Sequence, residues 1–150
     1  METIIRKAAE SDLGSVYRFL CELSSEELEL ETFKTIYLEN TSNTMNLYLV
    51  SETAGKVSGF ISFHTQNLLH HSGLVGEVQE FYVDKVFRGK GIGKLLMNEV
   101  KAYAKQNNLK SIEVTSNKRR TENVKVYENL GFRLSHNKFT IYLEKRTPLD

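Results

Sequence analysis

The feature that most constrains this chain is a glycine-rich turn between an apolar strand pattern and an amphipathic helix pattern. The segment GEVQEFYV leads into VDKVFRGKGIGKLL, where glycine recurs at Gly89, Gly91 and Gly93. Glycine permits positive φ and a close approach of the backbone to a ligand. The first N–H groups of the following helix lack intrahelical partners, and the helix dipole adds about half a positive charge there. The turn is therefore typical of a phosphate-binding site.

The spacing of this turn excludes two common phosphate-binding motifs. A P-loop, G-x-x-x-x-G-K-[ST], would need glycine in place of Arg88 and serine or threonine in place of Leu95. The dinucleotide fingerprint G-x-G-x-x-G, begun at Gly89, would need glycine in place of Lys94. The spacing does match [RQ]-x-x-G-x-[GA], which reads RGKGIG from Arg88 to Gly93.

With this motif the chain resembles the GNAT superfamily of acetyl-CoA-dependent N-acetyltransferases. The resemblance implies that the loop binds the pyrophosphate of coenzyme A through backbone amides, and that backbone groups of Phe81 and Val83 bond the pantetheine arm. A glycine-rich turn that binds no ligand is the plain alternative. The coenzyme-binding residues that the resemblance implies are Phe81, Tyr82, Val83, Arg88, Gly89, Lys90, Gly91, Ile92, Gly93, Lys94, Asn117, Asn123 and Tyr127.

The composition is that of one globular domain, which we expect to span residues 1–150. The 150 residues are 40% hydrophobic and 26% charged, and the formal net charge is +1. No global charge therefore directs the chain to nucleic acid or to an anionic membrane. No apolar run approaches the ~20 residues of a membrane-spanning helix. Cys21 is the single cysteine, which excludes an internal disulfide; we expect it in the core of a cytoplasmic protein.

The hydrophobic patterns predict the element order β-α-α-β-β-β-α-β-α-β-β. Helices are expected from Leu13, behind a Ser11-Asp12 cap, then over 28–39 and 92–107, and from a Thr121 cap to Gly131. Strands are expected at 4–8, 47–51, 57–65, 76–83, 111–115, 132–134 and 139–143. The Ala-Gly-Lys sequence at 54–56 predicts a turn that joins the second and third of these strands as a hairpin. The resemblance implies an α+β, sandwich-like GNAT fold. Its mostly antiparallel mixed sheet would have about seven strands, with a central splayed parallel pair and about four flanking helices.

Transfer of an acetyl group to an amine needs a group that takes up the proton of the amine. A free alkylammonium has a pKa of about 10.4, so ~0.1% of it is neutral at pH 7. Glu77 and Glu80 lie on the strand that leads into the loop. Strict alternation would put them on opposite faces of that strand, and a β-bulge would re-aim one of them. Either glutamate, directly or through water, is a candidate base; for each, the alternative is a solvated or ion-paired carboxylate.

The candidate acid is Tyr127, in the string NVKVYENLGF, four residues before Gly131. This string resembles the end motif of the family, which implies that the tyrosine protonates the departing thiolate. A phenol with a pKa of about 10 is suited to that exchange. Asn123 departs from the alanine that most members carry there. A half-polar core aromatic is the alternative role for Tyr127.

The flanking sequence bears on the acceptor amine. CELSSEE, LLHHSGLVGEVQEFYV and NKRRTENVKVYENLGFRLSHNKFT resemble the aminoalkylphosphonate N-acetyltransferases within the superfamily. The resemblance implies a small primary amine with an anionic group, which Arg119 and Arg120 could bind through bidentate hydrogen bonds. Candidate substrate-binding residues are His64, His70, His71, Arg119, Arg120 and His136. The histidines show no tight metal-ligand spacing, so no metal is predicted.

Three other functions stay open at this point. Acetylation of a protein N-terminus or lysine would need an open groove for an extended peptide. A non-catalytic coenzyme A-binding regulatory module would not need Glu77, Glu80 or Tyr127. Nucleic-acid binding through the Lys118-Arg119-Arg120 run is disfavoured by the near-zero net charge. A homodimer is expected only from the family resemblance.

Overall fold

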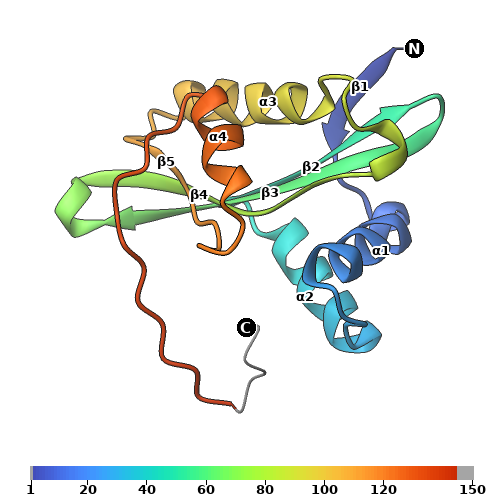
Figure 1. The fold of residues 1–150 in the computed structure, drawn as a ribbon, viewed down its shortest axis with the longest axis horizontal. Coiled ribbons are helices and arrows are strands. Elements are labelled where there is room, and N and C mark those ends of the chain that lie inside the picture. Colours follow the sequence, from blue (N-terminus) through green and yellow to red (C-terminus); the bar gives the residue numbers. More distant parts are fainter. Residues whose placement is uncertain (1, 145–150) are drawn as a thin grey trace. The chain divides into compact units, whose positions relative to one another are not determined.

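The computed structural model describes residues 2–144, and the chain forms two compact units. The first unit extends to Val114 and the second begins at Thr115. Short 3-10 turns, η1 (Glu10–Asp12), η2 (Leu69–His71) and η3 (Lys85–Phe87), join several of the elements. The helices and strands (Figure 1) are β1 (Thr3–Lys7), α1 (Leu13–Ser24), α2 (Leu30–Ser42), β2 (Asn46–Thr53), β3 (Lys56–Leu68), β4 (Gly73–Val83), α3 (Ile92–Gln106) and β5 (Ile112–Val114), then α4 (Glu122–Asn129).

The first unit contains a single mixed sheet in the order β1-β2-β3-β4-β5. All neighbours pair antiparallel except β4 and β5, which are parallel. The predicted turn at 54–56 is present: Ala54 and Gly55 have φ of 52° and 76°, and Thr53 pairs with Lys56. Two consecutive residues at positive φ match the twist that a tight hairpin needs. The expected α+β class, with its parallel pair and four helices, is confirmed for the described residues.

The predicted strand count was too high, since the sheet formed by the described residues has five strands rather than about seven. The segments 132–134 and 139–143 are not strands in the described part of the chain. Phe139 and Ile141, in the second of these segments, are 92% and 87% exposed. An alternating apolar pattern shows only that a segment would suit a half-buried β-sheet. The segment forms a strand only where the edge of a neighbouring strand is available for hydrogen bonds.

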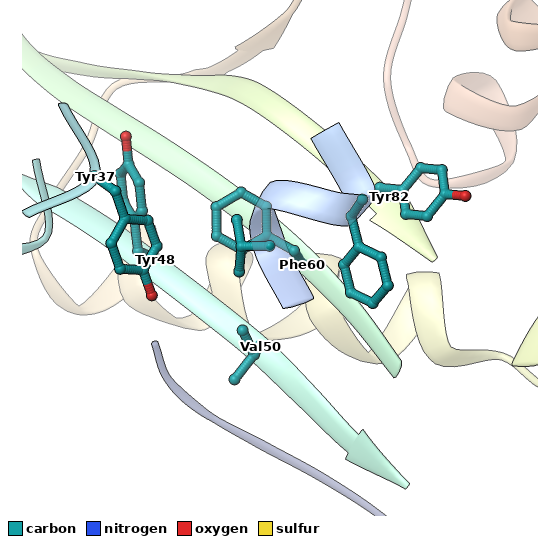
Figure 2. Packing of buried hydrophobic residues seen from close by; sticks show 7 residues of the cluster. Tyr37, Tyr48, Val50, Phe60 and Tyr82 are labelled. Carbon is teal, nitrogen blue, oxygen red and sulfur yellow. The ribbon is translucent and has the colours of Figure 1, made fainter. Parts of the chain in front are cut away.

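Helices cover both faces of this sheet (Figure 1). On one face, Val16 and Phe19 of α1 and Tyr37 of α2 pack against Tyr48, Val50, Phe60 and Tyr82 of the strands. Figure 2 shows these aromatic rings, which meet mainly edge to face, as Tyr48 and Phe60 do with centroids 5.7 Å apart. On the other face, α3 buries Leu96, Met97 and Val100. Helices of the first unit thus pack on both faces of the sheet.

Two local expectations were wrong in detail. Asp12 is the N-cap residue of α1, but its side chain makes no capping hydrogen bond to that helix. Its carboxylate instead accepts from the Ala9 N–H at 2.7 Å and from both terminal nitrogens of Arg6 at 2.8 and 2.9 Å. Cys21 is half-buried rather than in the core, and its Sγ accepts the Leu28 N–H at 3.5 Å. Among the described residues, no helix combines the length and the apolar character needed to cross a bilayer.

Candidate active site

The loop after β4 has the backbone geometry that the sequence predicts. Gly89 and Gly91 have φ of 78° and 80°, in the left-handed region where other residues are strained. Gly91 is also the N-cap of α3, and the Leu95 N–H donates to its carbonyl at 3.1 Å. The N–H groups of the three preceding helical residues therefore point ahead of the helix, together with the positive end of its dipole.

Gly93 brings the first turn of α3 close to β4. A Cβ at this position would lie 3.2 Å from Cζ of Phe81 and 3.8 Å from Cγ2 of Val83. Phe81 and Val83 therefore point toward α3, while Tyr82 between them belongs to the core cluster on the opposite face. The loop is thus tied to the end of β4 by direct packing of α3 on that strand.

The basic side chains of the loop differ in how they are held. Arg88 Nε donates to the Val83 carbonyl at 2.9 Å, and its guanidinium lies 5.1 Å from the centre of the Tyr82 ring. Lys90 Nζ lies 5.6 Å from the centre of the Phe87 ring. Lys94 is exposed on α3, and Ile92 anchors the start of that helix in the core. Three positive charges thus surround the glycines.

The parallel pairing of β4 with β5 is short. It joins Gly76 to Ile112, Glu77 to Glu113 and Val78 to Val114. From Gln79 to Val83, β4 continues along β3 without a β5 partner in the described structure. The family resemblance implies that the pantetheine arm adds to this part of the strand, and the early end of the pairing agrees with the expected splay.

A β-bulge in β4 brings the two candidate carboxylates onto one face. Ser62 pairs with Glu80 but its neighbour Phe63 pairs with Val78, so Gln79 is the extra residue. Since directly opposed residues share a face, Glu80 lies with Ser62. By the same rule Glu77 lies with its partner His64, and residues 62 and 64 are on the same face of β3. Strict alternation, which would put the two glutamates on opposite faces, therefore does not hold here, and the bulge re-aims one of them.

Both carboxylates and His64 have defined partners on this face, which is the face covered by α1 and α2. The Ser62 hydroxyl donates to Glu80 Oε1 and accepts from the Glu80 N–H at 3.0 Å. The side-chain amide of Gln79 donates to Glu77 Oε1 at 3.2 Å. His64 Nε2 lies 2.9 Å from the hydroxyl of Tyr48.

The Tyr48 hydroxyl links this face to α2. Asn40 Nδ2 donates to it at 2.8 Å, so the hydroxyl lies between Asn40 and His64. Burial raises the pKa of Tyr48 to about 12; the charge of Glu80 also raises it and the Asn40 bond lowers it. Tyr48 therefore stays a neutral phenol at any working pH. The result is a polar cluster of Glu77, Glu80 and His64 beside an uncharged hydroxyl.

The other two histidines of the first unit lie at the far end of β4. His70 and His71 occupy η2, with ring centroids 4.3 Å apart. His71 Nε2 lies 3.9 Å from a carboxylate oxygen of Glu113, which pairs with Glu77. Within residues 2–144, no group of three or more His, Cys, Asp and Glu side chains is arranged to hold a metal ion. Only His64 shares the face of both carboxylates through direct strand pairing.

The second unit holds the remaining candidate residues. Tyr127, on α4, packs edge to face on Phe132 with centroids 5.7 Å apart. Burial raises its pKa, and the charge of Arg120 partly offsets that rise. Asn123 Nδ2 donates to the Ser116 hydroxyl at 3.0 Å. Tyr127 is thus a protonated phenol throughout the neutral range.

A tight turn precedes α4. Asn117 Oδ1 accepts the Arg119 N–H at 2.9 Å, and its carbonyl accepts the Arg120 N–H at 3.0 Å. The side chains of Arg119 and Arg120 are exposed. His136 is also exposed, with its Nδ1 2.6 Å from the Ser135 hydroxyl.

Sequence reasoning missed Tyr48, Asn40 and Ser62 as members of the polar cluster. The hairpin turn alone would align Tyr48 with Ile61, because Thr53 pairs with Lys56. A second bulge, at Ser58, shifts the register by one residue, so that Tyr48 pairs with Ser62 instead. A shift of one residue reverses every face assignment along the strand. The residues of the hairpin turn can be recognised in the sequence, whereas no residue in the sequence marks the bulge at Ser58.

Comparison with known proteins defines the class. The sequence model of the acetyltransferase (GNAT) family matches residues 13–132. The chain belongs to the GNAT family of acetyltransferases, and its predicted membership is confirmed.

Particular relatives refine this assignment. The chain is 33% identical to the aminoalkylphosphonate N-acetyltransferase of Salmonella typhimurium over 136 residues, which cover 91% of this chain and 88% of that protein. It is 31% identical to an uncharacterized N-acetyltransferase of Methanocaldococcus jannaschii over 86 residues, 57% of this chain and 38% of that protein. The chain is thus similar to acetyl-CoA-dependent N-acetyltransferases and acts in that class.

Solved structures support the fold. A transcriptional regulator from Bacillus halodurans superposes with a TM-score of 0.87 at 23% identity, covering 95% of this chain and all of that one. Glucosamine-6-phosphate N-acetyltransferase from Arabidopsis thaliana superposes with a TM-score of 0.82 at 23% identity, covering 96% and 100%. At these identities the likeness defines the fold alone.

Proposed function

We propose that this protein transfers the acetyl group of acetyl-CoA to the primary amine of a small molecule that carries an anionic group, such as an aminoalkylphosphonate. The observation that carries the proposal is the position of Glu77 and Glu80 on one face of the strand that runs directly into the Arg88–Lys94 loop. The similarity to the Salmonella enzyme along 91% of this chain supports the substrate class.

The loop fits the phosphates of the coenzyme. The positive φ of Gly89 and Gly91 turns the chain so that the N-terminal amides of α3 converge ahead of the helix, and no atom lies within 4 Å of a Cβ built on either glycine. An anion there would gain hydrogen bonds and the favourable end of the helix dipole. Acetyl-CoA, when bound, supplies the thioester whose acetyl group is transferred. Phe81, Tyr82 and Val83 would hold its pantetheine arm, with Asn117 and Asn123 as further contacts.

Three side chains provide acid–base catalysis in this proposal. Glu77 or Glu80 removes a proton from the acceptor ammonium, directly or through an ordered water, and both accept hydrogen bonds that fix their carboxylates. Tyr127 donates a proton to the departing sulfur. Its raised pKa keeps the phenol protonated, as an acid must be before it acts. Each transfer of this kind contributes roughly 10²–10⁴-fold to the rate.

The anionic end of the acceptor needs a cationic partner. Arg119 and Arg120 are exposed guanidinium groups on the turn before α4, and guanidinium binds phosphonate with paired hydrogen bonds. His64, His70, His71 and His136 complete the candidate substrate contacts. A homodimer and a cytoplasmic location are also part of this proposal; they rest on the family resemblance and on the single cysteine.

An acceptor screen tests the proposal. The protein is mixed with acetyl-CoA and, separately, with 1-aminoalkylphosphonates, 2-aminoethylphosphonate, polyamines, aminoglycosides or peptides, and free thiol is measured. We expect release with aminophosphonates and little with uncharged amines of the same length. Release confined to peptides would replace the proposal by protein acetylation. Coenzyme binding without release for any amine would replace it by a regulatory, non-catalytic module.

A further inference from the structure

We propose that His64 is the group that accepts the proton of the acceptor amine, that Glu77 opposite it stabilises the resulting imidazolium, and that Tyr48 positions the His64 ring. This inference rests on the proposed function and assigns the role of the base to His64 in place of Glu77 or Glu80. The contacts that support it lie entirely within the first unit, on the face of β2, β3 and β4 that α1 and α2 cover.

The His64 ring is oriented by its bond to Tyr48. His64 Nε2 lies 2.9 Å from the Tyr48 hydroxyl, and the two rings stack with centroids 5.6 Å apart and planes 25° apart. The hydroxyl is itself fixed by the Asn40 amide at 2.8 Å. Tyr48 is 9% exposed, whereas His64 is half-buried. Since Nε2 is occupied by the phenol, Nδ1 is the ring nitrogen that remains for a substrate or a water.

Glu77 is the direct cross-strand partner of His64. Such partners have Cβ atoms about 4.5–5.5 Å apart, within reach of one another or of one shared water. A carboxylate at this range attracts a nearby cation. Glu80, which lies on the same face beside Ser62, adds a second negative charge that raises the pKa of Tyr48.

The charge of this face decides which end of the acceptor it receives. The titratable groups around His64 are Tyr48 on β2, Glu77 and Glu80 on β4, and Glu113 on β5 with its neighbour His71; α2 contributes the uncharged Asn40. Three carboxylates repel a phosphonate and attract an ammonium. The amine end of the acceptor is therefore the end that meets His64.

Imidazole is better suited than a carboxylate to receive the amine proton. Imidazoles in general change charge between pH 5 and 8, whereas free carboxyl groups do so near pH 4. A base whose pKa lies near the working pH is largely unprotonated there and is still basic enough to accept a proton, so it is the most effective proton acceptor. Glu77 and Glu80 then serve as charges that hold the ammonium and the imidazolium.

The protons of the reaction balance over one turnover. The ammonium gives one proton to His64 Nδ1, directly or through water, and His64 later releases it to solvent. The neutral amine forms the C–N bond with the acetyl carbon, and the C–S bond breaks. The second amine proton leaves as the amide forms, and the departing sulfur gains one proton from the acid, which is restored from that second proton through solvent.

The test compares four variants in steady-state kinetics with an aminophosphonate acceptor. His64→Gln keeps an amide near the Nε2 position but cannot titrate; we expect kcat to fall roughly 100-fold or more, with an unchanged KM for acetyl-CoA. The acidic limb of its kcat/KM profile should disappear. Free imidazole should restore part of the activity of His64→Ala. Tyr48→Phe should lower kcat by a smaller factor and shift the acidic limb.

Tyr37→Phe is the matched control. Tyr37 is a buried phenol of the same core cluster, its hydroxyl donates to the Ala9 carbonyl at 2.6 Å, and burial raises its pKa to about 12, as for Tyr48. Tyr37→Phe therefore also removes a buried hydroxyl, but one that makes no bond to His64, so we expect this variant to have an unchanged kcat and pH profile. Melting temperatures of all variants are recorded, and ¹⁵N NMR of the imidazole reports the Tyr48 bond independently of turnover.

The outcomes separate the two proposals. A wild-type protein that binds acetyl-CoA but acetylates no amine would overturn the proposed function and this inference with it. An active wild type together with a His64→Gln variant of normal kcat and normal acidic limb would overturn the inference alone. An equal loss of kcat in Tyr37→Phe and Tyr48→Phe would assign the Tyr48 effect to packing. An imidazole ¹⁵N spectrum unchanged by Tyr48→Phe would remove the positioning role.

Discussion

The substitution Gly91→Ala isolates the contribution of backbone conformation in the loop. Gly91 has φ of 80° and ψ of 9°, and no atom lies within 4 Å of a Cβ built there. The change therefore introduces no steric overlap with the rest of the protein, and left-handed strain of about 1–2 kcal/mol is its main cost. Gly14→Ala is the matched control, because Gly14 lies in α1, where alanine is favoured, and its Cβ also meets nothing within 4 Å.

Comparing these two variants removes the effect of the unfolded chain. Both lose the same glycine freedom when unfolded, so the difference in their free energies of unfolding is mainly the strain at Gly91. We expect Gly91→Ala to be the less stable by about 1–2 kcal/mol or somewhat more, because Gly14→Ala also gains helix propensity. Urea denaturation measures this difference directly, and the melting temperatures should differ by roughly 2–8 °C.

The same pair of variants tests the role of the loop. Calorimetric titration should show weaker acetyl-CoA binding for Gly91→Ala and unchanged binding for Gly14→Ala, because only the first alters the convergence of the α3 amides. Equal stabilities would refute the conformational argument. Unequal stabilities with identical acetyl-CoA affinities would refute the assignment of the loop to the coenzyme.

Two further predictions follow from the charged and phenolic groups. Tyr127→Phe should lower kcat by ~10²-fold or more and weaken acetyl-CoA binding far less; an unchanged kcat in stopped-flow or steady-state assays would discard the acid role. Asp12 is almost fully buried, and its bond to Arg6 is the main cause that lowers its pKa below 3.8. A lowered carboxyl pKa stabilises the fold above the unfolded pKa, and this stability is lost as pH falls through the folded value. Arg6→Lys, which loses the paired hydrogen bonds, should therefore cost about 1.5–3 kcal/mol at pH 7 and much less below pH 3 in urea titrations; a cost independent of pH would contradict this.

The sequence was sufficient where a local signal determines the structure. The positions of Gly89, Gly91 and Gly93 predicted the loop and the start of α3, and two of these glycines have the expected positive φ. The turn at Ala54 and Gly55 was also predicted, because few residues tolerate that conformation. In both places the identity of single residues sets the backbone.

The sequence was not sufficient where structure depends on pairing between distant strands. The string VQEFYV reads as regular alternation, so the bulge at Gln79 that unites Glu77 and Glu80 had no marker of its own. His64 was expected only as one of several candidate substrate contacts, and the register of β3 sets it opposite Glu77. The expected strands at 132–134 and 139–143 failed for the same reason, since an apolar pattern carries no information about its partner edge.

The most direct test of the coenzyme site is an NMR titration of ¹⁵N-labelled protein with acetyl-CoA. We predict that the largest shifts of backbone amides occur from Gly91 to Lys94 and from Gln79 to Val83. Gly55, which has a similar φ of 76° in the β2–β3 turn, is the internal control and should not move. Saturable binding with no change at the start of α3, or with its largest changes around Gly55, would contradict the account.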